Sequence, residues 1–294
     1  MTLGTEPDRS RSVDVLGSSM NVVDVGEAGE VPVLFLHGNP TSSFLWRHVI
    51  RDRPPGWRCI APDLIGMGRS GKPDIEYGLR DHIAYVDALV DALDLSQMVI
   101  VGHDWGVAIA FDRLRRFPDQ VGALAFMEAH LRPLVGWDDF DPGGRELFQQ
   151  LRTPGVGERM VLEENFFVET LLPAALQREL SPQEWAAYRR PYPDEASRRP
   201  LLRWAREIPV AGEPADAVAV MSAGAAGVTS SPVPKLLVHG RPGSIVTAET
   251  VEWCRRTMPA LTVVDVGGPA VHFLPEDRPA EVSYAVWSWA TSLP

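Results

Sequence analysis

The clearest chemical signal in this sequence is an aspartate that lies between two glycines at the end of an apolar run. The run 98–101 leads directly into Gly-His-Asp-Trp-Gly, in which the aspartate is Asp104. Glycines two positions before and after a central residue are typical of a strained strand-to-helix turn, which exposes the central side chain. The pattern predicts that Asp104 is a nucleophile, although an aspartate that only caps a helix would fit the same five residues.

An aspartate at this turn indicates a different reaction from the serine that most proteins carry there. A serine oxygen that attacked a saturated carbon would form an ether, which activated water could not cleave. A carboxylate that attacks the same carbon forms an ester, and water can hydrolyse an ester. Asp104 therefore indicates substitution at saturated carbon through a covalent intermediate.

A histidine near the end of the sequence is the candidate general base. His272 follows the last expected strand and precedes the closing helix. A single histidine is more often structural than catalytic, but a nucleophile followed much later by a histidine is the chain order of hydrolases with this turn. Because a carboxylate nucleophile is already ionised, we expect His272 to activate the water that attacks the ester.

The acid that orients His272 has two candidate positions. The loop 239–246, after the strand expected at 235–238, contains no carboxylate, and the nearest one is Glu249. Glu128 ends the apolar run 123–127, where a buried carboxylate is costly unless it is paired. We predict that Glu128 is the acid and that Glu249 is its rival.

Two hydrogen-bond donors are expected beside the nucleophile. Asn39 lies in the loop His-Gly-Asn-Pro after the first buried strand, and its side chain adds an amide donor. Trp105 follows the nucleophile, and its indole N–H can only donate. Both groups donate a hydrogen bond without transferring their proton. Such donors suit a leaving group that departs as a stable anion, such as halide. Asn39 alone would also fit a turn residue before Pro40.

The elements that position these residues follow from short apolar runs separated by helical periodicity. Two short strands are expected before residue 31, and two helices at 82–93 and 107–117. Strands that alternate with helices predict an α/β fold with a mainly parallel sheet covered on both faces. The remaining runs that we interpret as strands are 33–36, 58–61, 98–101, 123–127, 235–238 and 262–266.

The rhythm changes between about residues 132 and 231, where strand-like runs disappear. A helical insertion over the carboxyl ends of the strands fits this change, and a ligand crevice forms at that edge of such sheets. The small-residue segment 211–227 fits a linker and a helix equally well. The short helical stretches in the insertion are 145–151, 160–171, 182–189 and 198–206.

Composition excludes several classes of function. The 294 residues, 45% hydrophobic and 23% charged, suit one large α/β domain with an insertion. A net charge of −11 argues against a nucleic-acid partner. No run reaches the roughly 18 apolar residues that a membrane span needs, and residues 1–13 lack the apolar stretch of a signal peptide. We therefore expect a cytoplasmic protein, with Cys59 and Cys254 as free thiols.

These residues together resemble the haloalkane dehalogenases of the α/β-hydrolase superfamily. The closest likeness is to the subfamily whose catalytic acid is a glutamate after the sixth strand, and it spans almost the whole chain. The matching stretches are HGNPTSSFLWRHVI (37–50), PDLIGMGRSGKP (62–73), VGHDWGVAIAFD (101–112), FME followed by RP (126–133), NFFVETLLP (165–173), IPVAGEPA (208–215), PVPKLL (232–237) and VHFLPEDRPAEV (271–282).

The resemblance implies an eight-stranded, mostly parallel sheet with a helical cap inserted after the sixth strand. The core would comprise residues 1–131 and 232–294, and the cap residues 132–231. The implied reaction converts a haloalkane and water into an alcohol, a halide ion and a proton, in a monomer or weak homo-oligomer. Neither a cofactor nor a metal is implied, since no His/Asp/Glu cluster has the spacing of metal ligands.

The family's site residues carry over position by position. The resemblance makes Asp104 the nucleophile, His272 the base, Glu128 the acid, Asn39 and Trp105 the halide-binding pair, and Phe167 and Pro209 cap residues that line the halide pocket. This chain departs from the family in the spacing between Glu128 and Arg132, which is longer by one residue than usual, and in details of the loop 241–246.

Three alternatives remain open on the sequence alone. An epoxide hydrolase shares the aspartate and the histidine and needs tyrosines in the cap, where Tyr188 and Tyr192 lie. It usually carries an aromatic residue at the position of Asn39, so Asn39 and Trp105 argue against it. A coelenterazine-oxidising luciferase has nearly the same triad and halide pair. A non-catalytic binding protein on this fold would not need a complete triad.

Overall fold

The computed structural model describes residues 10–140 and 142–293, and their strands form one sheet of eight in the order β1-β2-β4-β3-β5-β6-β7-β8. Strands β1 and β2 are antiparallel to each other, and β2 is antiparallel to β4, whereas β4, β3 and β5 to β8 run parallel. The predicted α/β fold is therefore confirmed. The strands are Ser10–Val15 (β1), Ser18–Val25 (β2), Val31–Leu36 (β3), Trp57–Pro62 (β4), Met98–His103 (β5), Val121–Met127 (β6), Lys235–His239 (β7) and Leu261–Asp265 (β8).

The central strands are apolar at successive positions because helices cover both faces of the sheet. In β3, Leu34 and Leu36 belong to one apolar cluster, and Val33 and Phe35 belong to the cluster on the opposite face. Helices α2, α3, α9 and α10 and parts of the segment between β6 and β7 contribute residues to the first cluster, and α1 and α12 contribute residues to the second. These helices are Leu79–Ala92 (α2), Trp105–Arg116 (α3), Ala215–Ser230 (α9), Ala248–Thr257 (α10), Arg47–Arg51 (α1) and Pro279–Ala290 (α12).

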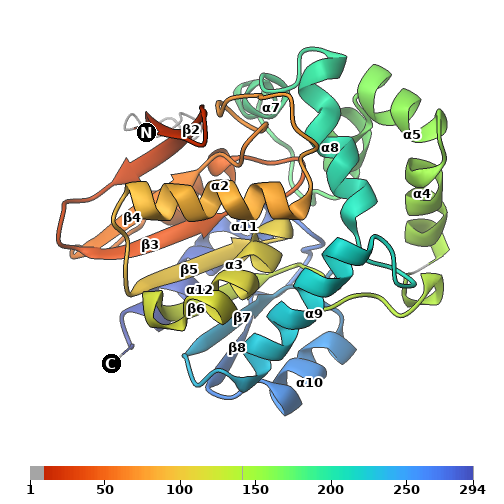
Figure 1. Cartoon of the computed structure of the whole chain (residues 1–294). Helices are drawn as coiled ribbons and strands as arrows, with labels where there is room; N and C mark the ends of the chain where they lie inside the picture. Colours follow the sequence, from red (N-terminus) through yellow and green to blue (C-terminus); the bar gives the residue numbers. More distant parts are fainter. Residues whose placement is uncertain (1–9, 141, 294) are drawn as a thin grey trace.

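The segment between β6 and β7 is helical, as predicted, and most of it gathers at one end of the sheet (Figure 1). The segment contains α4 (Pro142–Arg152), α5 (Val156–Glu158), the π-helical turns Arg159–Glu163 and Phe167–Leu171, α6 (Leu172–Ala174), α7 (Pro182–Arg189) and α8 (Glu195–Glu207), followed by α9. Three of the four expected helical stretches, 145–151, 182–189 and 198–206, lie within α4, α7 and α8. The stretch 160–171 is not one helix, because the chain leaves the helical conformation at residues 164–165, where Asn165 has a positive φ of 52°.

Helix α9 differs from the rest of this segment. It shows that the small-residue stretch is largely helical, and it packs along α3 against the face of the sheet (Figure 1). The division into a core of 1–131 and 232–294 and a cap of 132–231 therefore stays a proposal, and α9 lies with the core layers although the proposed boundary assigns it to the cap.

Several general expectations concern the whole chain. Cys59 and Cys254 are free and buried, as predicted. Across the ranges that the structure describes, we find no helix with the length and apolar character that crossing a bilayer requires. Residues 1–9, which include most of the segment where we expect no signal peptide, lie outside the described residues.

Candidate active site

Asp104 lies at the turn between β5 and α3, as the glycine spacing predicts. Its backbone has a φ of 53° and a ψ of −126°. Residues other than glycine rarely adopt this combination, and where they do it stores strain at functional turns. The turn is crowded, because a Cβ on Gly106 would lie 2.2 Å from the carbonyl oxygen of Leu36 in β3. Only glycine allows α3 to begin this close to the sheet.

The two carboxylate oxygens of Asp104 have different surroundings. Oδ1 accepts a hydrogen bond from the backbone N–H of Asn39 at 2.7 Å. Oδ2 lies 3.8 Å from Nε2 of His272. Burial raises the pKa of Asp104, while His272 and the backbone N–H groups of Trp105 and Asn39 oppose this rise. One oxygen is thus fixed by the main chain, and the other is free to react.

His272 lies between two carboxylates. Its Nε2 faces Asp104, and its Nδ1 lies 3.7 Å from Oε2 of Glu128. Both distances exceed those of hydrogen bonds, as is common in active sites without substrate. Burial lowers the pKa of His272, but Glu128 and Asp104 outweigh burial and raise it overall.

The backbone of His272 is held more tightly than its ring. Its carbonyl oxygen accepts hydrogen bonds from Nε2 of His103 at 2.9 Å and from the N–H of Leu274 at 3.0 Å. The carbonyl can only accept, so His103 carries its proton on Nε2. Burial lowers the pKa of His103 well below its ordinary value, and the ring is therefore a neutral donor.

Glu128 reaches His272 from the end of β6. It is fully buried, and its Oε2 accepts hydrogen bonds from the backbone N–H groups of Ser244 at 3.2 Å and Ile245 at 3.0 Å. The loop after β7, which has no carboxylate, thus supplies backbone donors to a carboxylate from the neighbouring strand. Glu249 lies exposed in the first turn of α10.

Both candidate halide donors contact α8. The side-chain amide of Asn39 donates to the carbonyl oxygen of Leu201 at 3.3 Å. The ring of Trp105 stacks on Trp204, with centroids 4.5 Å apart, and Trp204 stacks on His82 of α2, with centroids 4.1 Å apart. Burial lowers the pKa of His82 to about 3, so this imidazole is neutral.

Sequence reasoning missed His82, His103 and Trp204. His103 could have been considered, because it directly precedes the nucleophile. His82 and Trp204 carry no local signal, because the sequence around each predicts only an aromatic side chain on the buried face of an amphipathic helix. Their roles depend on a stack that joins three helices far apart in the chain.

The two predicted cap residues are less closely tied to the site. Phe167 is buried at the start of a π-helical turn and belongs to the same apolar cluster as Trp105. Pro209 is buried, and its carbonyl accepts a hydrogen bond from the N–H of Leu134 at 2.8 Å. Within the described ranges, no hydrogen bond links either residue to Asp104 or His272, and their roles stay predictions.

Known proteins are similar to this chain over nearly its full length. Residues 31–277 match the model of the alpha/beta hydrolase fold. A haloalkane dehalogenase of Mesorhizobium japonicum is 45% identical, with 98% of this chain and 92% of the relative covered. One from Sphingobium indicum is 42% identical, with 100% and 99% covered. The crystal structure of haloalkane dehalogenase DbeA from Bradyrhizobium elkani has a TM-score of 0.94 at 43% identity, with 97% of this chain and 98% of that chain covered.

Proposed function

Because this chain belongs to the haloalkane dehalogenases of the α/β-hydrolase fold, we propose that it hydrolyses the carbon–halogen bond of small haloalkanes to an alcohol, a halide ion and a proton. The observation that carries this proposal is the position of Asp104. Its Oδ1 is fixed by the N–H of Asn39, and its Oδ2 faces His272.

In the first step, Oδ2 of Asp104 attacks the carbon that bears the halogen. A carbon–oxygen bond forms, and the carbon–halogen bond breaks with both of its electrons leaving on the halide. The amide of Asn39 has two N–H groups, and only one is needed for Leu201, so the second can donate to the halide together with the indole of Trp105. Fixed donors at a developing anion stabilise the transition state strongly.

In the second step, neutral His272 takes a proton from a water molecule that attacks the carbonyl carbon of the ester. The negative charge develops on Oδ1, where the N–H of Asn39 already donates. Glu128 stabilises the imidazolium that forms, as a buried carboxylate does in other triads. When the intermediate collapses, the bond between the Asp104 carbonyl carbon and the substrate oxygen breaks, and this oxygen takes the proton of the imidazolium and leaves as the alcohol. The acid formed at Asp104 then releases its proton, which restores the carboxylate and accounts for the proton among the products.

The position of Tyr188 supports dehalogenation over epoxide opening, because epoxide opening needs phenol donors near the nucleophile. The hydroxyl of Tyr188 donates to Glu276, outside the triad. The ring of Tyr192 is buried, with Nζ of Lys72 lying 5.5 Å from its centroid.

A His272→Phe variant tests the covalent step directly. It should still expel one halide per enzyme molecule and then stop, because the ester has no base to hydrolyse it. Mass spectrometry after mixing with a bromoalkane should show one alkyl adduct on the peptide that contains Asp104. Full multiple turnover by this variant would remove His272 from the mechanism.

Halide affinity distinguishes the two substrate classes. Trp105→Phe should slow the alkylation step about 10²-fold and weaken inhibition by bromide, because one fixed donor is lost. Asn39→Ala should weaken bromide inhibition in the same way. If bromide affinity were unchanged in both variants and the wild type turned over epoxides, the protein would instead be an epoxide hydrolase.

A further inference from the structure

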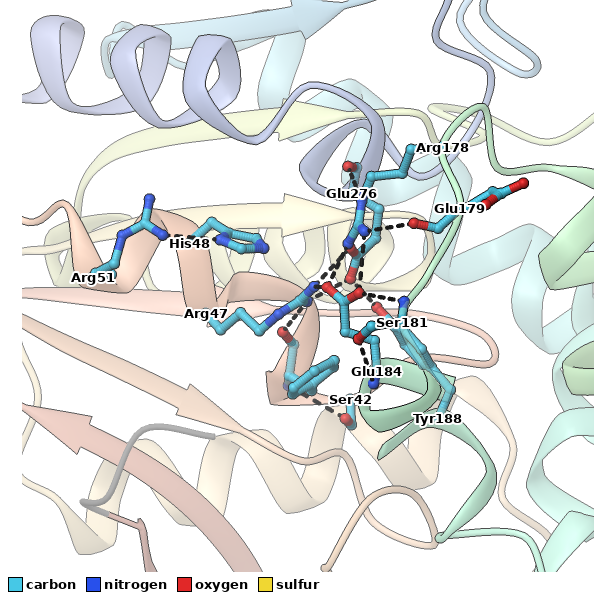
Figure 2. Close-up of polar contacts among 11 residues, drawn as sticks. Ser42, Arg47, His48, Arg51, Arg178, Glu179, Ser181, Glu184, Tyr188 and Glu276 are labelled. Carbon is cyan, nitrogen blue, oxygen red and sulfur yellow. Dashed lines mark hydrogen bonds and ion pairs between the residues drawn. The ribbon is translucent and has the colours of Figure 1, made fainter. Parts of the chain in front are cut away.

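A second group of charged side chains lies buried where the helical segment meets the sheet. Figure 2 shows Arg47 of α1 and Glu276 of α11 (Leu274–Asp277) in contact with Arg178, Glu184 and Tyr188, which come from α7 and the segment before it. We call these five residues the ion cluster. None of them has a place in the reaction described above.

Glu276 is the centre of the ion cluster. Its carboxylate is fully buried and is gripped by Arg47, with Nη1 2.5 Å from Oε1 and Nη2 2.8 Å from Oε2. Arg178 and the hydroxyl of Tyr188 also donate to its two oxygens. Every oxygen of this buried carboxylate is thus hydrogen-bonded, which is what makes burial of a charge tolerable.

Glu184 completes a neutral arrangement. It accepts from Nη2 of Arg47 at 2.7 Å and from Nη2 of Arg178 at 2.8 Å, so each guanidinium bridges the two carboxylates. The side chains of Glu184, Glu276 and His48 lie close enough to hold a metal ion. The guanidinium groups already occupy the carboxylate oxygens and balance both charges, so the ion cluster does not suit a cation.

The ion cluster is connected to the catalytic histidine through α11. Glu276 follows His272 by four residues, and its carbonyl oxygen accepts from Nε of Arg178 at 2.7 Å. The next residue, Asp277, accepts from the backbone N–H of Gln177 at 2.7 Å. The helical segment therefore grips α11 by both its main chain and its side chains.

Apolar contacts continue this connection up to the histidine itself. Phe273 is buried in a small cluster with Phe44 of the core and with Leu172 and Tyr188 of the helical segment. Its ring lies 4.7 Å from that of His272. Since the His272 ring has only loose contacts with both carboxylates, its position depends on how this stretch of chain is held.

We infer that the ion cluster positions His272. It fixes α11 against α1, so that the position of the helical segment determines the position of the imidazole that activates water. This inference rests on the proposed function. Arg47, Arg178 and Tyr188 are accordingly positioning residues, which touch neither the substrate nor the reacting atoms. The ester-hydrolysis step, which uses His272, should depend on the ion cluster, and the alkylation step should not.

Arg178→Gln is the sharpest test, because Arg178 is the most exposed charge of the ion cluster, with 27% of its side chain accessible. In rapid-quench experiments with a bromoalkane, alkylation should change less than about twofold. Hydrolysis of the alkyl-enzyme should slow about ten- to a hundredfold, since small displacements of catalytic groups have effects of that size. Arg178→Lys should recover part of the rate, and Tyr188→Phe should slow hydrolysis a few-fold.

The matched control is Arg189→Gln on α7. Arg189 forms an exposed pair with Glu169 inside the helical segment and makes no contact with α11 in the described residues. It should leave both steps unchanged. An equal loss in both steps for Arg178→Gln, or a lower melting temperature with unchanged hydrolysis, would show that the ion cluster only stabilises the fold and would overturn the inference.

A measurement without substrate separates this inference from the proposed function. The imidazole N–H proton of His272 should give a resonance that shifts or broadens in Arg178→Gln but not in Arg189→Gln. If the wild type released no halide and the resonance still moved, the proposed function would fail and the positioning role would stand. If the wild type turned over haloalkanes and the resonance and hydrolysis were unchanged in Arg178→Gln, the positioning role would fail.

Discussion

The active site and the ion cluster are both buried and charged, and they meet along residues 272–276, but their charges are compensated differently. At Glu276, burial raises the pKa, but Arg47 and Arg178 outweigh burial and lower it overall. At Asp104, burial raises the pKa, and only His272 and backbone N–H groups oppose it. Permanent cations hold the first carboxylate in place, and their absence among the groups that stabilise Asp104 leaves the second carboxylate reactive.

This difference predicts how substitutions in the two regions affect the fold and the reaction. Removing a group from the ion cluster leaves a buried charge without its partner and should weaken the fold. Removing the carboxylate of Asp104 relieves an incompletely compensated charge and should abolish the reaction while the fold survives.

The largest effect is expected for Asp104→Ala. Halide release should fall by about 10⁴-fold or more, as for the loss of other covalent nucleophiles. The melting temperature should not fall, because the variant loses a carboxylate whose pKa burial has raised. Halide release and thermal unfolding measured on the same preparation check both parts. Residual multiple turnover would contradict the covalent mechanism.

The next effect concerns the acid. Glu128→Gln should slow ester hydrolysis by about 10² to 10⁴-fold and leave ester formation nearly unchanged, because only hydrolysis produces an imidazolium. The alkyl-enzyme should then accumulate in a burst of halide. Glu249→Gln, in which the changed side chain is exposed on α10, is the control and should match the wild type.

A second substitution sharpens the assignment of the acid. Ile245→Asp in the Glu128→Gln background places a carboxylate in the loop whose backbone now contacts Glu128, and partial recovery of hydrolysis would support the role of this position. A fully active Glu128→Gln single variant would show that Glu128 is not the acid.

The ion cluster should give the opposite result. Arg47→Gln leaves the buried carboxylates of Glu276 and Glu184 short of a cation and should lower the free energy of unfolding by about 3–5 kcal/mol. Denaturant titration measures this loss. Arg51→Gln, on the same helix, loses the exposed pair with Asp52 and a contact of 3.3 Å with Nδ1 of His48, and it should cost less than about 1 kcal/mol. Equal losses in the two variants would refute the comparison.

The smallest effect is a separation of the two steps by pH. Hydrolysis requires neutral His272, so its rate should fall on acidification. In the alkyl-enzyme the charge of Asp104 is gone, and Glu128 is the main group that still opposes the lowering of the His272 pKa by burial. Alkylation requires ionised Asp104, whose pKa burial also raises, but from an ordinary value of 3.8, well below that of histidine. Acidification should therefore accumulate alkyl-enzyme, as single-turnover rates between pH 5 and 9 would reveal. Glu128→Gln should move the pH at which the hydrolysis rate falls to a lower value. If the rates of both steps fell at the same pH, the assignment of alkylation to Asp104 and of hydrolysis to His272 would be contradicted.

The sequence allowed us to predict those parts of the molecule that depend on neighbouring residues. The buried strands follow from short apolar runs, and the turn at Asp104 follows from two glycines at fixed spacing. The choice of Glu128 followed from the loop 239–246, which lacks a carboxylate, and the structure places its carboxylate 3.7 Å from His272. Its role in the reaction stays a prediction.

Other features could not be predicted, because they join residues that are distant in the chain. Arg47 and Glu276 are 229 positions apart, and neither stands in a pattern that marks it as buried. The stack of His82, Trp204 and Trp105 likewise depends on how three helices meet. The small-residue composition of α9 likewise did not indicate that this helix packs on α3, because its partner lies about 100 positions earlier in the chain.

The contact between Glu128 and the loop after β7 has a consequence for redesigning this enzyme. Glu128 takes its hydrogen bonds from the main chain at positions 244 and 245, and the side chain of Ser244 is exposed. Any residue except proline supplies the same N–H group. Position 244 can therefore be randomised, for instance to alter solubility or to attach a label, while the carboxylate keeps its donors; proline is the one choice to leave out of such a library.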